Sequence, residues 1–190
     1  MDLEAMADAL QRSGDYVVLR RLAAFEKRPL PPGAQTRLGL FVDVETTGLD
    51  PAHDEIIELA MVPFTYDVDG EIYEVGEPFQ ALREPSRPIP PEVTAITGID
   101  AAMVEGKSIS PDGVTAFAAP AALVVAHNAA FDRKFLERFC PTFTTKAWAC
   151  SMSQIDWAAE GFEGAKLSYL ATGAGFSTSA TGRHTTAWPP

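Results

Sequence analysis

The 190-residue sequence has only two cysteines, Cys140 and Cys150, and its longest apolar runs are short. The cysteines form no CxxC pair and have no histidine cluster beside them, which argues against a zinc site or a disulfide framework. No apolar run approaches the roughly 20 residues that span a bilayer. The first ten residues, MDLEAMADAL, lack the basic and then apolar pattern of a secretion signal. We therefore expect a cytoplasmic protein with no membrane partner.

Positive charge is also scarce, because 15 lysines and arginines stand against 26 acidic residues and give a net charge of −11. This balance argues against a broad basic surface that holds duplex DNA by neutralising phosphates. It does not exclude a pocket that binds a few nucleotides, if metal ions supply positive charge locally or a partner adds affinity.

The chain divides into three parts by its sequence pattern. Apolar residues recur at helical spacing up to about Lys27, with a break at residues 13–15, and predict two short helices. The prolines of RPLPPG, residues 28–33, indicate a linker. We predict a helical segment and linker at 1–36, a main domain at 37–176 and an aberrant or truncated tail at 177–190.

Inside the main domain, strand patterns come first and helices then alternate with a strand. This order predicts an α/β fold in which helices pack on a mixed sheet. The predicted strands are residues 38–44, 56–66, 72–79 and 123–126. The predicted helices are residues 92–97, 111–118, 129–139, 151–159 and 166–171.

The stretch LGLFVDVETTGLD places two acids, Asp43 and Glu45, at the end of an apolar strand. Side chains two residues apart on a strand point to the same side, so these carboxylates should share one volume. They repel each other unless a cation lies between them, and oxygen ligands favour a hard ion such as Mg²⁺ or Mn²⁺. Taken alone, the pair also fits a solvated strand end. Residues 46–48 predict a tight turn whose backbone N–H groups can face an anion.

A second motif, VVAHNAAFDRKFL, runs from a short strand into an amphipathic helix. Asn128 is a plausible N-cap, and Asp132 lies about one turn inside the helix. The alternative interpretation makes Asp132 a first-turn acid, favoured by the helix dipole and paired with Arg133 or Lys134. The matching alternative for His127 is a hydrogen-bonded loop residue.

Together, DVETTG and HNAAFD resemble the first two motifs of the DnaQ-like (DEDD) 3′–5′ exonucleases, which include the proofreading epsilon subunit of bacterial DNA polymerase III. The segment PEVTAITGI lies between them, and the resemblance covers residues 37–176. It implies a ribonuclease H-like fold with a five-stranded mixed sheet. It further implies that Asp43, Glu45 and Asp132 hold two Mg²⁺ or Mn²⁺ ions. Thr46 and Asn128 would line the pocket of the terminal nucleotide, with Ile96 near its base.

The implied partners are a single-stranded 3′ end of DNA and a DNA polymerase subunit. The family's third motif, a histidine followed five positions later by aspartate, is missing. His184 has Pro189 at that position, and no acid occurs after Glu163. We therefore expect impaired catalysis. The alternatives are a non-catalytic module that binds nucleic-acid ends or a polymerase, and an RNA-trimming exonuclease of the same superfamily.

The tail after Phe176 has no apolar periodicity and offers no closing helix. With suitably chosen codons for residues 177–188, reading two bases later gives Tyr-Glu-Arg-His-Arg-Ala-Pro-His-Asp-Cys-Leu. That string contains histidine and aspartate at the family's spacing. The hypothesis is a frame change near Phe176; a natural short form or a deliberately shortened chain is the competing explanation, and the gene sequence decides between them.

Overall fold

The structure is a computed structural model that describes residues 2–177, and its backbone contacts divide the chain into two units. The larger unit comprises residues 25–155, and the smaller one combines residues 2–24 with residues 156–177. His184 and the rest of the predicted tail from residue 178 onward lie outside the described residues. The predicted domain boundaries after residues 36 and 176 stay a prediction.

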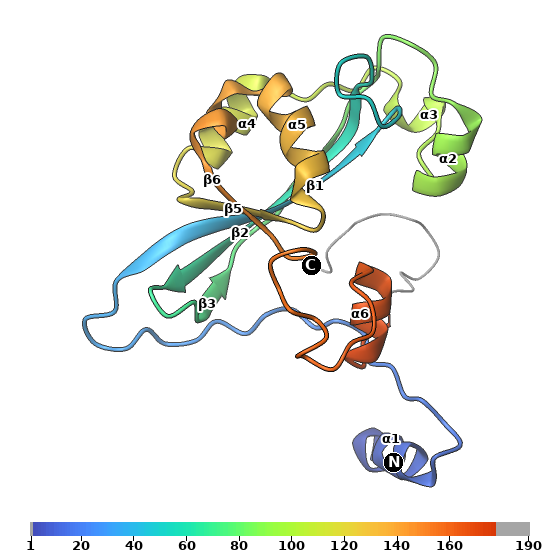
Figure 1. The fold of residues 1–190 in the computed structure, drawn as a ribbon, viewed down its shortest axis with the longest axis vertical. Coiled ribbons are helices and arrows are strands. Elements are labelled where there is room, and N and C mark those ends of the chain that lie inside the picture. Colours follow the sequence, from blue (N-terminus) through green and yellow to red (C-terminus); the bar gives the residue numbers. More distant parts are fainter. Residues whose placement is uncertain (1, 178–190) are drawn as a thin grey trace. The chain divides into compact units, whose positions relative to one another are not determined.

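The larger unit is built on a mixed sheet of six strands, drawn from blue to orange in Figure 1. The order is β3-β2-β1-β5-β6, and β4 also pairs with β2. β1 runs antiparallel to β2 and parallel to β5, and β5 is parallel to β6. The strands are β1 (Thr36–Thr46), β2 (Ile56–Asp67), β3 (Ile72–Val75), β4 (Phe79–Leu82), β5 (Leu123–Ala126) and β6 (Ala147–Cys150).

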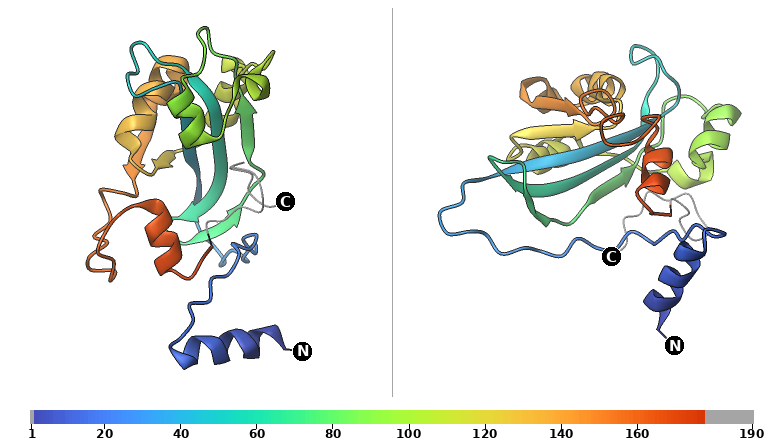
Figure 2. Two further views of the ribbon diagram at one scale, coloured as in Figure 1. Left: turned by 90° about the vertical axis from the view of Figure 1, so that its right-hand side faces the viewer. Right: turned by 60° about the horizontal axis from the view of Figure 1, so that its bottom comes forward.

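Two helices, α4 (Pro111–Ala118) and α5 (Ala129–Phe139), cover one face of this sheet (Figures 1 and 2). Because side chains alternate along a strand, Leu40, Val42 and Val44 of β1 point into the core under these helices. The residues between them point to the opposite face. The shorter elements α2 (Pro91–Thr97), α3 (Ala101–Val104) and η1 (Pro141–Thr145) complete this unit.

The smaller unit contains α1 (Leu3–Ser13) and α6 (Leu167–Gly173). Asp2 caps α1 by accepting hydrogen bonds from the N–H groups of Glu4 and Ala5. Within the unit, Arg20 forms a parallel bridge with Phe176. None of the helices in residues 2–177 has both the length and the apolar composition needed to cross a membrane.

The predicted strands at 38–44, 56–66 and 123–126 and the predicted helices at 92–97, 111–118, 129–139 and 166–171 are confirmed, with small changes at their ends. The prediction of a single strand at 72–79 is wrong, because this strand is interrupted between β3 and β4. Gly76 donates its N–H to the carbonyl of Pro63 there, and Pro78 follows. The two short strands pair with successive parts of β2, so the sheet has six strands rather than five.

The predicted helix at 151–159 is also wrong, since this segment forms turns after β6, a strand that the sequence did not reveal. Gln154 accepts the N–H of Cys150 through its side chain at 2.6 Å, and Ser151 donates its N–H to Ala126. Such local bonds compete with helical ones. The second N-terminal helix is absent too, because Gly14 ends α1 and Arg20 pairs as an extended residue.

Candidate active site

Asp43 and Glu45 extend from β1 on the face of the sheet opposite α4 and α5, as the two-residue spacing predicts. Asp43 is exposed, and Glu45 is partly buried. Both lie at the carboxyl end of β1, in the centre of the sheet. The strand continues only to Thr46, and the loop to β2 then begins.

Asp132 reaches this end of β1 from the first turn of α5. β5 pairs with β1 only as far as Phe41, so the backbone of Val44 lies beyond the last β5 partner. Asp132 replaces that partner, because its Oδ1 accepts the N–H of Val44 at 3.2 Å. Its side chain is only 3% exposed. The bond places the acid of α5 beside the backbone segment that joins Asp43 and Glu45.

Glu58 is a fourth acid at this place, and the sequence analysis missed it. It lies on β2 directly opposite Glu45 in the antiparallel register, so both side chains project from the same face. The residue is 9% exposed, and Gln80 of β4 donates to its Oε1 at 2.7 Å. The only sequence signal was an acid inside the apolar run IIELAM.

The electrostatics show that the four carboxylates act on one another. Burial, together with the charges of Asp43, Glu58 and Asp132, raises the pKa of Glu45 to about 7. Burial and then the charge of Asp43 raise the pKa of Asp132 to about 7. The pKa of Asp43 is raised as well, first because protein atoms crowd its carboxylate although the residue as a whole is exposed, and then by the charge of Glu58; His127 opposes this effect. Negative charge is therefore concentrated here at a cost that a bound cation would relieve.

The donor set consists of carboxylate oxygens, which suits Mg²⁺ or Mn²⁺ better than zinc. As the side chains stand, no three histidine, cysteine, aspartate or glutamate residues in 2–177 are gathered closely enough to hold a metal ion. The donor atoms and the concentrated negative charge nevertheless fit a divalent cation. To share an ion, the carboxylates of β1 and α5 would have to turn toward one another.

Thr46 is buried, and its hydroxyl donates to the carbonyl of Gly48 at 2.6 Å. Of the N–H groups in the turn at residues 46–48 that were expected to face an anion, that of Thr47 instead donates to the backbone carbonyl of Glu55 at 2.9 Å. The Thr47 hydroxyl donates to Asp54. The turn after β1 is therefore closed by its own hydrogen bonds.

Asn128 precedes α5 in the left-handed conformation, with φ 73° and ψ 47°. It occupies the N-cap position, as predicted, although its side chain makes no capping hydrogen bond. His127 lies beside it and pairs its Nδ1 with the hydroxyl of Ser151 at 3.0 Å. Ile96 lies on α2 and is 79% exposed.

The sequence profile of the RNase_T exonuclease family matches residues 40–186. A PolC-type DNA polymerase III from Thermotoga petrophila is 36% identical over 118 residues, which are 61% of this chain and 8% of that protein. A DNA polymerase III subunit epsilon-like protein from Rhodobacter capsulatus is 43% identical over 99 residues, 50% of this chain and 14% of that protein. The chain thus spans only a small part of these curated relatives.

Among solved structures, Exonuclease X in complex with 5′-overhanging duplex DNA is 30% identical, with a TM-score of 0.50. The match covers 78% of this chain and 80% of that one. A structure of Exonuclease I has a TM-score of 0.57 at 21% identity, over 75% of this chain and 36% of that one, and shows likeness of fold alone. The resemblance to DnaQ-like exonucleases and the ribonuclease H-like α/β fold are confirmed: this chain belongs to the RNase_T exonuclease family.

Proposed function

We propose that this chain is a 3′–5′ exonuclease of the proofreading type. It removes nucleotides from a single-stranded 3′ end of DNA, depends on two Mg²⁺ or Mn²⁺ ions, and acts beside a DNA polymerase subunit. Family membership supports the reaction class. The observation that carries the proposal is the bond from Val44 to Asp132, which holds the acid of α5 at the backbone of the residue between Asp43 and Glu45.

In this proposal Asp43, Glu45 and Asp132 hold the cations, while Thr46, Asn128 and Ile96 contact the terminal nucleotide. When bound, two divalent ions supply an acidified water and positive charge for the leaving 3′ oxygen. The chain's own part is to fix the ligands. Val44 holds one oxygen of Asp132 in place, and the pairing of β1 with β2 sets the distance between Glu45 and Glu58.

Catalysis should be weak in this chain. The third motif would supply a histidine base and a further carboxylate, yet His184 is followed five positions later by Pro189 and no acid follows Glu163. A missing ligand lowers metal affinity and activity together.

The test uses single-stranded DNA labelled at its 5′ end in one assay and at its 3′ end in another, with Mn²⁺. We expect slow, stepwise shortening of the 5′-labelled strand. The 3′ label should be released in the first cleavage of each strand. Asp43→Asn should lose this activity, whereas Asp69→Asn, in the turn between β2 and β3, should keep it. Equal activity in the Asp43→Asn variant and the unaltered chain would refute the assignment.

The missing third motif favours a second candidate, a non-catalytic module that binds nucleic-acid ends. In that case the same assay with Mn²⁺ would release no nucleotide, while the protein would still bind labelled 3′ ends in a fluorescence anisotropy titration. Repeating both measurements with RNA of the same sequence distinguishes the RNA-trimming alternative, since the two strands differ in the 2′-hydroxyl.

A further inference from the structure

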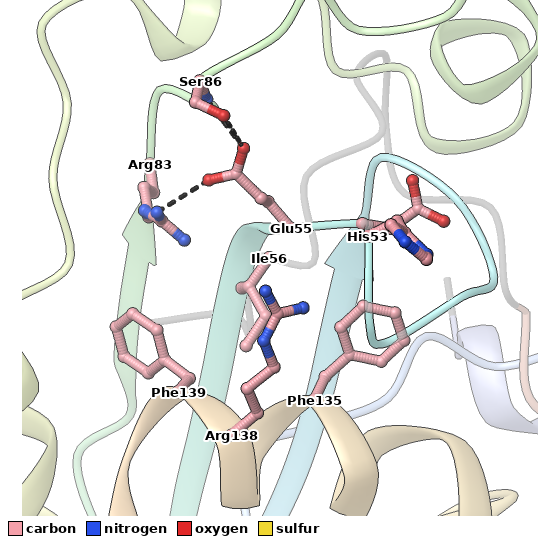
Figure 3. A pocket seen from close by; sticks show the side chains of 9 residues that line it. His53, Glu55, Ile56, Arg83, Ser86, Phe135, Arg138 and Phe139 are labelled. Atoms are coloured by element: carbon pink, nitrogen blue, oxygen red, sulfur yellow. Dashed lines mark hydrogen bonds and ion pairs between the residues drawn. The ribbon is translucent and has the colours of Figure 1, made fainter.

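A cavity of about 400 Å³ opens beside the candidate active site, between the β1–β2 loop, the segment after β4 and the later turns of α5 (Figure 3). Apolar side chains form its base, and polar ones surround its opening. The base consists of Ile56, Phe135 and Phe139, and the opening of His53, Arg83, Ser86 and Arg138.

The two acids of the cavity are already engaged by neighbouring donors. Glu55 accepts hydrogen bonds from Arg83 at 2.8 Å and from the backbone N–H of Ser86 at 2.8 Å (Figure 3). Asp54 accepts one from the Thr47 hydroxyl at 3.2 Å and one from the Asp50 N–H at 2.9 Å. Both carboxylates are therefore held in place within the wall, and Arg83 offsets the charge of Glu55.

Arg138 lines the cavity without a charged partner. Within residues 2–177 its guanidinium hydrogen-bonds only the carbonyl of Pro51 and forms no ion pair, whereas Arg133 on the same helix is paired with Glu137 at 2.7 Å. Arg87, which does not line the cavity, likewise bonds only the carbonyl of His53 among these residues. The charge of Arg138 acts on Asp50, whose carboxylate is hydrogen-bonded to His53 at 2.7 Å. Since a guanidinium carries five N–H donors, most of those of Arg138 remain available to a ligand.

The cavity adjoins the acids through two elements. Ile56, in its base, is the register partner of Thr46, the residue after Glu45. Phe135 lies on α5 one helical turn after Asp132, which is the neighbour spacing of an α-helix. These two elements connect the cavity, which lies on the α5 side of the sheet, to the end of β1 that carries the acids.

We propose that the cavity binds a backbone phosphate of the nucleic acid, with Arg138 as the cation that contacts it; this rests on the proposed function. A planar guanidinium matches two phosphate oxygens, and His53 lies on the same opening. The Ser86 hydroxyl is not available, because it already donates to Glu55. A chain of net charge −11 needs such local cations to hold a polyanion.

The test is the salt dependence of binding to single-stranded DNA, measured with EDTA so that no turnover occurs. One lost phosphate contact should make the slope of log affinity against log salt shallower by about 0.7. We expect this change for Arg138→Ala and for Arg138→Gln, which keeps a donor for Pro51. Arg138→Lys and the control Arg133→Ala should retain the slope of the unaltered chain.

An unchanged slope in both uncharged variants, or no measurable DNA binding by the unaltered chain, would overturn the proposal. So would tight binding of inorganic phosphate that Arg138→Gln abolishes without changing the DNA slope, since the cavity would then serve a free anion. The binding assay requires no cleavage. It therefore tests the phosphate site even if the chain proves to have no nuclease activity.

Discussion

Asp132 combines a structural contact with a charge. One carboxylate oxygen replaces a strand partner for Val44. Burial, and after it the charge of Asp43, raises the pKa of Asp132 to about 7. Asparagine retains an oxygen acceptor and removes the charge, while alanine removes both. The two substitutions therefore separate the two roles.

We predict that Asp132→Asn folds as stably as the unaltered chain or more so at pH 8, because a charge opposed by burial is gone. Asp132→Ala leaves the Val44 N–H without its acceptor and should lower the free energy of unfolding by about 1–3 kcal/mol. Both variants should lose nuclease activity with Mn²⁺. Urea denaturation measures the stabilities, and equal stability of the two variants would show that the Val44 bond contributes nothing.

At the scale of elements, the register of β1 against β2 decides which acids face each other. The pairing sets Glu58 opposite Glu45. Burial, with the charges of Asp43, Glu58 and Asp132, raises the pKa of Glu45 to about 7. In the folded chain Glu45 therefore binds its proton more tightly than in the unfolded chain, where a glutamate titrates near 4.5. Between about pH 4.5 and 7 the folded state holds more protons, so stability falls as pH rises through this range.

We predict that the melting temperature, measured in EDTA, decreases from pH 5 to pH 8 and that Glu58→Gln reduces this decrease. The substitution removes one of the charges that raise the pKa of Glu45, and Gln80 can still bond the new amide. Glu105→Gln, on an exposed residue at the end of α3, serves as the control. A pH dependence that is the same in Glu58→Gln and the unaltered chain would contradict the prediction.

The same register explains how far the sequence could predict the site. Alternation within one strand was enough to place Asp43 and Glu45 on one face, and helical spacing was enough to place Asp132 on α5. Glu58 could not be found in this way, because its role depends on which residue of another strand lies opposite. The short β6 and the break between β3 and β4 were missed for a similar reason, since pairing with β5 and β2 defines them.

At the scale of the whole molecule, 26 acids and 15 cations leave few positions that can hold a phosphate. Activity then depends on metal ions at the acids and on arginines such as Arg138 beside them. The family resemblance implies a further aspartate, five positions after a histidine, and the sequence has none at that spacing after Glu163. Whether this missing acid limits catalysis can be tested by supplying it.

We predict that replacing residues 177–187 by the second reading, Tyr-Glu-Arg-His-Arg-Ala-Pro-His-Asp-Cys-Leu, increases Mn²⁺-dependent release of 3′ nucleotides by at least about tenfold. The reason is that the replacement supplies a histidine base and an acid at the family's spacing, and loss of a metal's supporting groups commonly costs about 10–100-fold. The matched control carries the same segment with its aspartate changed to asparagine, and it should remain as slow as the unaltered chain. The Mn²⁺ affinity, measured by calorimetry in parallel, should rise only in the replacement that keeps the aspartate. If neither release nor affinity increases, the missing acid does not limit this chain, and the binding-module alternative gains support.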